Sequence, residues 1–472
     1  MHVLTSANSC STSIEGINIT SKNSATIQPS EIQFYEQEIE YSCTSQKKQK
    51  QRANMTTNSG NDAAVGAKGK FAAIVVCWFL GNGSLISWNS MLTIVDYYGY
   101  LFPNYHPSRI LTLVYQPFAL GTIAILTRYE AKLNTRRRNL SGYLLFFVSS
   151  LLVVALDLAS SGRGGVGPFI GLCAISAAFG IADAHVQGGM LGDLSLMCPE
   201  FVQSFMAGLA ASGAFSSALR FITRAAFEDS KGGLRKGAIL FFSICSTLEL
   251  VCVLLYAFVF PKLEIVKYYR SKAALEGSKT VSADLAAGGV QLELNQMEIE
   301  DPKELERLSV KELFRQNIDY CLDLYFIYVL TLSIFPGFLV EDTGSHSLGN
   351  WYALVLVAAY NVLDLIGRYT PLIKILKISS RPILTLACLS RFLMIPAFYF
   401  TAKYGSQGWM IMLTSILGFT NGHLTVCVLT VAPKGYKGPE QNALGNVLCC
   451  WLLSGIFSGV VLDWLWLIGK GW

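Results

Sequence analysis

The chain has 472 residues, of which 52% are hydrophobic, 15% charged and 12% aromatic, with a formal net charge of +5. Soluble domains carry about 25% charged residues, and disordered chains combine more charge with fewer aromatic residues, so the composition excludes both classes. A mean hydropathy of +0.42 indicates a polytopic membrane protein. The small net charge gives no reason to expect a nucleic-acid partner.

Residues 1–70 are polar and rich in Ser, Thr, Asn and Gln. They contain no apolar core of a signal peptide, so the sequence predicts a disordered cytoplasmic N-terminal tail. Met55 opens a plausible short leader, and we expect residues 1–54 to be dispensable for transport.

Eleven apolar runs follow, each long enough for a membrane helix of about 20 residues. They are residues 71–101, 108–128, 140–160, 168–194, 200–225, 237–260, 321–340, 349–370, 382–402, 407–432 and 443–468. The fold class predicted is an all-α polytopic membrane protein, with transmembrane helices 1–6 in residues 71–262 and helices 7–11 in residues 321–472. The hydrophilic residues 263–320 between them are predicted to form a flexible cytoplasmic loop with some helix.

The distribution of Lys and Arg predicts the orientation of the chain. Segments such as 128–138 and 262–272 are rich in these residues, whereas 341–348 contains none. Because cytoplasmic loops carry the excess of positive charge, we expect a cytoplasmic N-terminus and an extracellular C-terminus. The expected location is the plasma membrane, with the vacuolar membrane as the alternative.

Polar groups inside the spans are candidates for function, since a charge at the bilayer centre costs roughly 2.5–3.5 kcal/mol on insertion scales. In NVLDLIGRY, the residues Asn361, Asp364 and Arg368 share one helical face. A carboxylate accepts hydrogen bonds from hydroxyls and a guanidinium donates them, so this set suits a polyhydroxyl ligand such as a ribose. The alternative is a structural salt bridge between two helices.

The first span places Trp88 and Asn89 at mid-membrane depth, with Asp96 seven residues after Asn89 on the same face. Trp88 can stack on a planar ring. The alternative is an interfacial tryptophan, which its mid-span position disfavours.

In the fourth span, Asp183 and Gln187 lie four residues apart on one face, and Gln187 offers the donor and acceptor that a base edge needs. His185 faces roughly the opposite way, as a packed neutral residue or a proton carrier.

No catalytic motif appears: the sequence has no G-x-S-x-G, no H-E-x-x-H and no Walker A motif. Its twelve cysteines include no C-x-x-C pair. We therefore expect a protein that is not an enzyme and that needs no cofactor and no metal ion.

Six motifs make the chain resemble the equilibrative nucleoside transporter family, and specifically its plant members, over residues 71–468. They are WNSML, the Gln-Gly of VQGGMLGD, TLSIFPGF, NVLDLIGR, SRFLMIPAF, and GFTNGHLTV with the following Pro433. The resemblance implies eleven helices in a six-plus-five arrangement similar to the major facilitator fold, with a cavity between the two bundles.

The resemblance also implies roles for individual residues. Trp88 corresponds to a tryptophan beside the substrate, and Leu92 to a position that shapes cavity specificity. Gln187 resembles the glutamine that reads the nucleobase, and Asp364 with Arg368 the pair that holds the ribose.

The chain departs from the family at two places. Ser87 stands where a proline commonly precedes the tryptophan, and Asp183 and His185 stand where many members have uncharged residues. These titratable groups, together with Asp96, are candidates for proton coupling, which plant members are often regarded as having. Proton-linked and purely equilibrative transport therefore both stay open.

The function predicted is transport of purine and pyrimidine nucleosides, such as adenosine and uridine, by alternating access. A porter for a sugar or another small polar metabolite is the rival within transport. Expected partners are nucleosides, membrane lipid and, in the coupled case, protons. A receptor or scaffold is disfavoured, because charged residues share a buried helical face and no soluble ligand domain is present.

Overall fold

The computed structural model describes residues 69–227, 230–275, 278–290, 308–341, 348–404 and 406–467. Within these ranges all regular secondary structure is helical, and eleven helices are long and apolar enough to cross a membrane. The all-α fold and the eleven predicted spans are confirmed. The predicted N-terminal tail, apart from its last two residues, lies outside the described residues.

Each of the first six spans has one principal helix, and apart from the end of the first, the starts and ends lie close to the predicted ones. The principal helices are α2 (Lys70–Thr93), α4 (Pro107–Arg128), α5 (Thr135–Ser160), α6 (Val166–Ser195), α7 (Pro199–Ala225) and α8 (Gly233–Leu254), with the α8 span continuing to Lys262.

Two of the last five spans are each built from two helical pieces. The helices are α12 (Ile318–Leu332) with α13 (Gly337–Glu341), α14 (Tyr352–Tyr369), α15 (Arg381–Ser390) with α16 (Met394–Tyr404), α17 (Gln407–Val431) and α18 (Gly438–Asp463). Four helices lie outside the eleven principal ones: α3 (Val95–Leu101), α9 (Glu264–Leu275), α10 (Ser282–Ala287) and α11 (Val310–Gln316).

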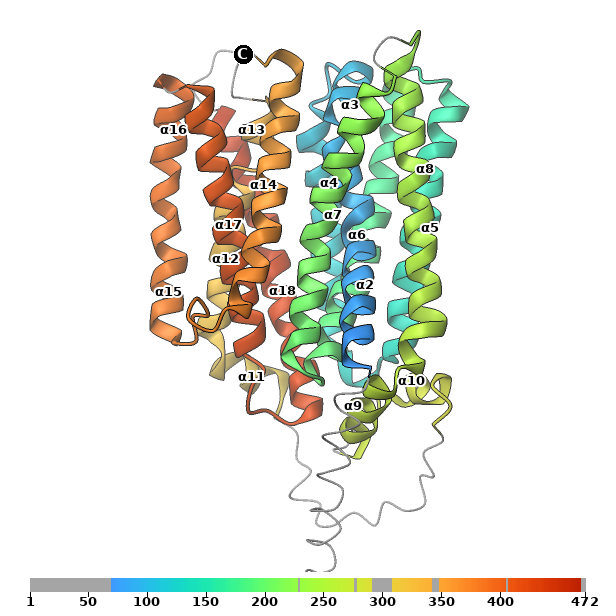
Figure 1. Cartoon of the computed structure of the whole chain (residues 1–472), viewed down its shortest axis with the longest axis vertical. Helices are drawn as coiled ribbons and strands as arrows, with labels where there is room; N and C mark the ends of the chain where they lie inside the picture. The colour runs from blue at the N-terminus through green and yellow to red at the C-terminus, as the bar shows by residue number, and fades with distance from the viewer. Residues whose placement is uncertain are drawn as a thin grey trace, which may run out of the picture. The chain divides into compact units, whose positions relative to one another are not determined.

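The spans form two groups in the order of the chain (Figure 1). In the first group α2 packs on α7, while α6 packs on α4 and α5; in the second group α14 packs on α17 and α12 on α18. The two groups meet where α7 contacts α14 and where α18 contacts α4 and α6. The interface between the halves is therefore built mainly by five helices.

Small residues allow α2 and α7 to approach closely. A Cβ atom added at Gly208 would collide with the backbone of Trp78, and one added at Gly81 would collide with the backbone of Phe205. Gly81 and Gly208 therefore serve helix packing, as small residues do in other membrane helices.

The first predicted span is interrupted, which the sequence pattern did not show. Helix α2 ends at Thr93, Ile94 has the non-helical angles φ −87° and ψ 28°, and the short helix α3 follows. Despite this break, Asp96 stays on the face of Asn89 that packs on α7. Asn89 donates to Ser212, and Asp96 accepts from Arg220 about two turns further along α7, so the expectation of a shared face is confirmed.

Part of the hydrophilic segment is ordered against the first half. Arg270 of α9 donates from Nε to Oδ1 of Asp193 on α6 at 3.2 Å, and its Nη1 lies 3.6 Å from Oδ1 of Asp284 on α10. Burial raises the pKa of Asp284 to about 6, although Arg270 and Arg136 oppose the shift. Residues 264–287 thus include two helices, α9 and α10, that pack on the first half, where the sequence predicted a flexible cytoplasmic loop with some helix. Residues 291–307 lie outside the described part of the chain.

Candidate functional site

A central cavity of about 110 Å³ lies between the two halves and is lined by α2, α4, α6 and α7 on one side and α12, α14, α17 and α18 on the other. Its lining brings together all seven residues predicted to bind substrate, together with one coupling candidate. They are Trp88, Asn89, Leu92, Gln187, Asn361, Asp364 and Arg368, and Asp183. The cavity holds several times the roughly 10–15 Å³ that one water molecule requires.

Asp364 and Arg368 form a buried ion pair on α14. Arg368 donates from Nε to Oδ2 of Asp364 at 3.0 Å, and the two residues are only 5% and 4% exposed. The spacing of four residues places both side chains on one face of the helix. Arg368 also donates from Nη1 to the carbonyl oxygen of Met206 on α7 at 2.7 Å, so the pair reaches across to the first half.

The second oxygen of Asp364 is held by a chain of side chains. Asn421 of α17 donates to Oδ1 of Asp364 at 2.8 Å, and Thr331 of α12 donates to Asn421 at 2.9 Å. The buried Arg391 in turn donates to the Thr331 hydroxyl at 2.9 Å. Asp364 is therefore fixed from three helices, and its orientation does not depend on a ligand.

Sequence reasoning did not assign Asn421 and Arg391 to the site. Both lie in motifs that carried the family resemblance, GFTNGHLTV and SRFLMIPAF. The available signal was polarity at membrane depth, because an arginine or asparagine inside a span needs a partner there. Which partner it has depends on how α12, α14 and α17 pack.

Gln187 and Asp183 interact on the opposite wall. Gln187 donates from Nε2 to Oδ1 of Asp183 at 2.5 Å, and both side chains are buried on α6. Within the described part of the chain no hydrogen bond reaches the Gln187 carbonyl oxygen, so that atom is available to accept from a ligand. Gln116 of α4 is also buried at the cavity, with its carbonyl oxygen unpaired among the described residues, and sequence reasoning missed it.

Trp88 lines the cavity next to an aromatic partner. Its ring centroid lies 4.1 Å from that of Tyr115 on α4, with an angle of 31° between the planes. Trp88 is 6% exposed, so it is a buried residue and not an interfacial one. The paired rings offer a flat apolar surface for a planar group.

Two asparagines attach the cavity walls to α7. Asn89 donates to the Ser212 hydroxyl at 2.6 Å, and Asn361 donates to the Ser217 hydroxyl at 3.1 Å and to the carbonyl oxygen of Gly213 at 3.2 Å. Helix α7 therefore connects the tryptophan helix of the first half with the ion-pair helix of the second.

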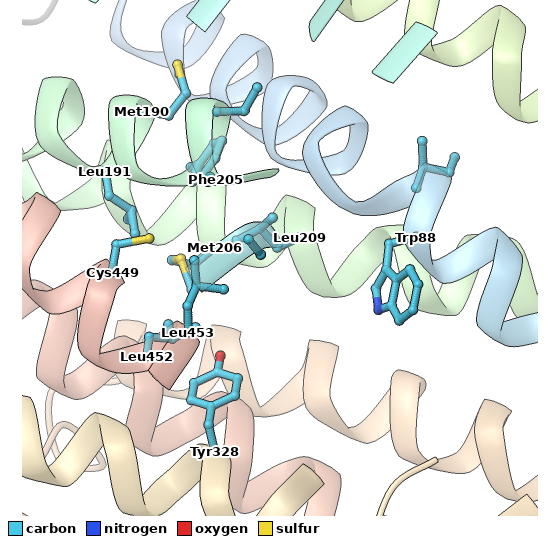
Figure 2. Packing of buried hydrophobic residues seen from close by; sticks show 14 of the residues in the cluster. Trp88, Met190, Leu191, Phe205, Met206, Leu209, Tyr328, Cys449, Leu452 and Leu453 are labelled. Atoms are coloured by element: carbon cyan, nitrogen blue, oxygen red, sulfur yellow. The ribbon is translucent and has the colours of Figure 1, made fainter. Parts of the chain in front are cut away.

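Aromatic and apolar residues complete the lining. Figure 2 shows Tyr328 extending from its helix toward Met206 and Leu453, and Phe335 stacks on Tyr360 with centroids 4.1 Å apart. Tyr328, Phe335 and Tyr360 all line the cavity. The sequence placed TLSIFPGF in the seventh span but gave no reason to assign its phenylalanine to the cavity.

Two proton-coupling candidates lie away from the central cavity. Asp96 accepts from Arg220 at 2.7 Å and lies 3.4 Å from Arg224, so two cations neutralise it. His185 is partly buried, and its Nδ1 lies 2.9 Å from the carbonyl oxygen of Ile181 in its own helix. Of the candidates, Asp183 alone lines the cavity within the described residues.

A larger vestibule of about 600 Å³ opens between α3, α4 and α7 of the first half and α14 of the second. A small hollow lies between this vestibule and the cavity, because it shares Trp88 and Leu92 with the cavity and Pro107 and Ser108 with the vestibule. Trp88 and Leu92 therefore separate the cavity from the vestibule.

The end of the interface near α9 and α10 is closed by hydrogen bonds between the halves. Arg138 of α5 donates to the Asn446 side chain of α18 at 2.7 Å, and Asn442 of α18 donates to Glu130 at 2.7 Å. A Cβ atom at Gly192 of α6 would collide with the Asn442 side chain. These contacts join the two halves at this end in the described conformation.

The opposite end also has contacts between the halves, but they leave the vestibule between them. Arg109 of α4 donates to Asp463 of α18 at 3.1 Å, and the guanidinium of Arg224 lies 4.1 Å from the ring centroid of Trp351. The structure thus has a cavity that is closed near α9 and α10 and borders a vestibule on the other side.

The described residues contain no group of three or more His, Cys, Asp or Glu side chains that could hold a metal ion.

Comparison with known proteins places these features in a family. The family described as "Nucleoside transporter" matches residues 172–468. Equilibrative nucleotide transporters 3 and 6 of Arabidopsis thaliana are 69% and 66% identical over 404 residues, covering 85% of this chain and 96% of each of those proteins.

Among solved structures, the proton:xylose symporter XylE of the major facilitator superfamily aligns with a TM-score of 0.54 at 12% identity, covering 85% of this chain and 88% of that one. This likeness shows the fold, and the predicted major-facilitator-like arrangement is confirmed. Because the family description matches more than half of the chain and the relatives match over nearly their whole length, the chain belongs to the equilibrative nucleoside transporter family and is a transporter, not an enzyme.

Proposed function

We propose that the chain carries nucleosides such as adenosine and uridine through the central cavity, with the ribose on Asp364 and Arg368 and the base beside Trp88 and Gln187. One observation carries this proposal: groups suited to the two ends of a nucleoside line a single cavity from opposite halves. A ligand that bridges the halves can favour one arrangement of them over another, as alternating access requires.

The ion pair still has hydrogen-bond donors and acceptors that a ribose can use. Each carboxylate oxygen of Asp364 has two lone pairs, and Arg368 and Asn421 each occupy one site on a different oxygen. Arg368 has five N–H donors, and its bonds to Asp364 and Met206 use two of them. Vicinal hydroxyls can therefore donate to the carboxylate and accept from the guanidinium together.

Charge favours a nucleoside over a nucleotide. Arg368 is the only cationic side chain among the described residues lining the cavity, and Asp364 already neutralises it. A phosphate group brings a charge of about −1.5 to −2 and is usually held by several unpaired donors. The opposite wall, with Asp183 and Gln187, offers no cation to a phosphate group, although the relatives at 69% and 66% identity are named nucleotide transporters.

The orientation proposed is a cytoplasmic N-terminus in the plasma membrane and an extracellular C-terminus. Support comes from the Lys- and Arg-rich ends of α4, α5 and α9, which lie near the closed end of the cavity, and positive charge favours the cytoplasmic side. The vestibule then opens to the outside, and the cavity accepts substrate from there.

Uptake of labelled adenosine and uridine into cells lacking nucleoside transport tests the proposal. We expect saturable uptake that ribonucleosides compete for better than 2′,3′-dideoxynucleosides, because Asp364 and Arg368 bind the hydroxyls. Asp364→Asn should remove this preference, and Ser454→Ala, on α18 outside the cavity lining, serves as the control. Uptake that free sugars inhibit as strongly as nucleosides do would favour the rival sugar porter.

A further inference from the structure

Glu249 is a buried carboxyl group that the transport site does not use. It lies within the α8 span with an exposed fraction of 0%. Its Oε1 accepts a hydrogen bond from the hydroxyl of Ser87 on α2, whereas Oε2 has no hydrogen-bond partner among the described residues. The sequence offered one signal, a lone glutamate inside an apolar run, and this signal was overlooked.

The described surroundings of Glu249 contain no cation. The titratable side chains near it are Tyr143 of α5 and Cys245 and Cys252 of α8, all of which are uncharged when protonated. The face of α2 toward Glu249 presents Ser87 and Gly83, neither of which can ionise.

The charged residues of the neighbouring helices lie near the ends of those helices and have partners of their own. They are Lys70 with Glu200, Asp157 with Arg235, Asp96 with Arg220 and Arg224, Arg136 with the carbonyl oxygen of Ala257, and Arg138 with Asn446; Arg137 lies in the first turn of α5. An ionised Glu249 would therefore be a buried charge without a counter-ion, which is strongly unfavourable. In this packing Glu249 holds a proton.

The carboxyl group is connected to the substrate cavity through one residue. Ser87 directly precedes Trp88, which lines the cavity, so α2 presents one face to Glu249 and another to the substrate. The Ser87 and Ser150 hydroxyl oxygens are 2.7 Å apart, so α5 takes part in the same cluster. The buried hydroxyls of Ser149 and Ser246 have no partner among the described residues, and water could satisfy them if the helices separated.

We propose that Glu249 is the proton-binding site through which nucleoside transport is coupled to a proton gradient, an inference that rests on the proposed function. The carboxyl group keeps its proton while α2 packs against α8. When α2 moves during alternation, water reaches the carboxyl group and takes the proton, and the carboxylate is then hydrated. One proton enters from one side of the membrane and leaves on the other, and no bond other than O–H is made or broken.

The coupling arises because α2 carries both binding surfaces. A protonated Glu249 favours the packing that places Trp88 and Asn89 at the cavity, so proton and nucleoside stabilise the same arrangement. Asp96 does not fit this role because Arg220 and Arg224 neutralise it. Asp183 lines the substrate cavity itself and accepts a hydrogen bond from Gln187, so it belongs to the substrate site and not to a separate proton site.

Glu249→Gln in the full chain, reconstituted in liposomes, tests the site. Glutamine reproduces the size and neutrality of the protonated acid but cannot release a proton. For the wild type we expect adenosine accumulation to rise by up to about tenfold per pH unit of inward gradient, the limit for one proton per nucleoside. Glu249→Gln should keep adenosine exchange at equal pH and lose accumulation.

Asp323→Asn is the matched control, because Asp323 of α12 is also buried, accepts from Thr385 at 3.1 Å and lies outside the cavity lining. It should keep the accumulation. A response to the gradient that survives in Glu249→Gln, or that is lost equally in Asp323→Asn, overturns the assignment.

A second variant, Ser87→Ala, tests the same site even if Glu249→Gln does not fold. Ser87→Ala removes the hydrogen bond that the protonated carboxyl group accepts in the packed arrangement, so proton binding weakens and the pH of half-maximal uptake should move to a lower value; an unchanged pH profile overturns the proposal. Wild-type exchange without any effect of the gradient would refute the coupling alone. Absence of nucleoside exchange in the wild type would instead refute the proposed function.

Discussion

Asp364 and Asp183 face the same cavity from opposite halves, but their surroundings differ. Asp364 has an arginine in its own helix and an asparagine from a neighbouring helix, and Arg391 supports this set through Thr331. Asp183 is hydrogen-bonded to Gln187, and no cation lies on that wall among the described lining residues.

The difference indicates that the two halves have different roles in transport. A charged group held from several directions is preorganised, so it binds a ligand without first having to be ordered. The wall with Asp183 and Gln187 has fewer fixed contacts, so fewer interactions must break when the first half moves. Glu249, another carboxyl group without a cation, also lies in the first half. We therefore expect the second half to anchor the ribose and the first half to respond to proton and base.

The largest effect should come from Arg368→Ala, which breaks the preorganised wall. It leaves Asp364 buried without its cation, at a cost of roughly 3–5 kcal/mol. Uptake should fall at least about a hundredfold, or the protein should fail to reach the membrane. Surface labelling and thermal unfolding in detergent separate these two results.

The double variant Arg368→Met with Asp364→Leu is the control for that experiment. Replacing both charges with apolar groups should restore the folded protein without restoring uptake. Wild-type uptake by Arg368→Ala would show that the ion pair has no part in binding.

A smaller effect is expected from the opposite wall. Gln187→Met removes the amide but keeps the length of the side chain, and the loss of a hydrogen bond to a base should lower adenosine affinity by roughly 1–3 kcal/mol, about five- to 150-fold. The preference for ribonucleosides over dideoxynucleosides should stay intact, in contrast to Asp364→Asn. Competition assays with Gln187→Met and Asp364→Asn measure adenosine affinity and the preference for ribonucleosides. If both variants changed these two quantities in the same way, the two walls would not have separate roles in binding.

Arg391→Met should have a more moderate effect, because Arg391 reaches the site only through Thr331 and Asn421. We expect about tenfold weaker adenosine binding, close to the loss of one hydrogen bond in the chain that orients Asp364. Thr420→Val removes a different acceptor of Arg391, at 3.0 Å from Nε, and should change affinity less. Equal effects of the two variants would mean that Arg391 acts through general packing.

The smallest effect concerns a carboxyl group outside the membrane. The pKa of Asp284 is raised to about 6, above its usual value near 4, so the folded state binds the proton more tightly than the unfolded state does. Its contribution to stability is therefore present below pH 4 and is lost as the pH rises through about 6.

Asp284→Asn should remove this part of the pH dependence, on the order of 1–2 kcal/mol, while uptake stays near wild type. Thermal unfolding between pH 4.5 and 7.5 measures the effect. Glu264→Gln, on the exposed side of α9, is the control and should leave the profile unchanged. A pH profile of Asp284→Asn identical to that of the wild type would refute the interpretation.

Several features of this protein were determined by the sequence alone. Run length and the polarity of single residues are local properties, so the eleven spans and the all-α fold could be predicted. Helical spacing is also local, and it placed Asp364 with Arg368 and Asp183 with Gln187 correctly on shared faces. The roles proposed for these residues in binding stay predictions until transport is measured.

The tertiary structure alone decided which helix faces which. Asp96 was a plausible proton carrier on its own helix, but packing brings it to Arg220, which is 124 residues away. Glu249 gains its importance from Ser87, 162 residues earlier in the chain. A pattern within one helix reports the faces of that helix, whereas an interhelical hydrogen bond depends on the register and rotation of two helices, and close packing of the whole bundle sets both.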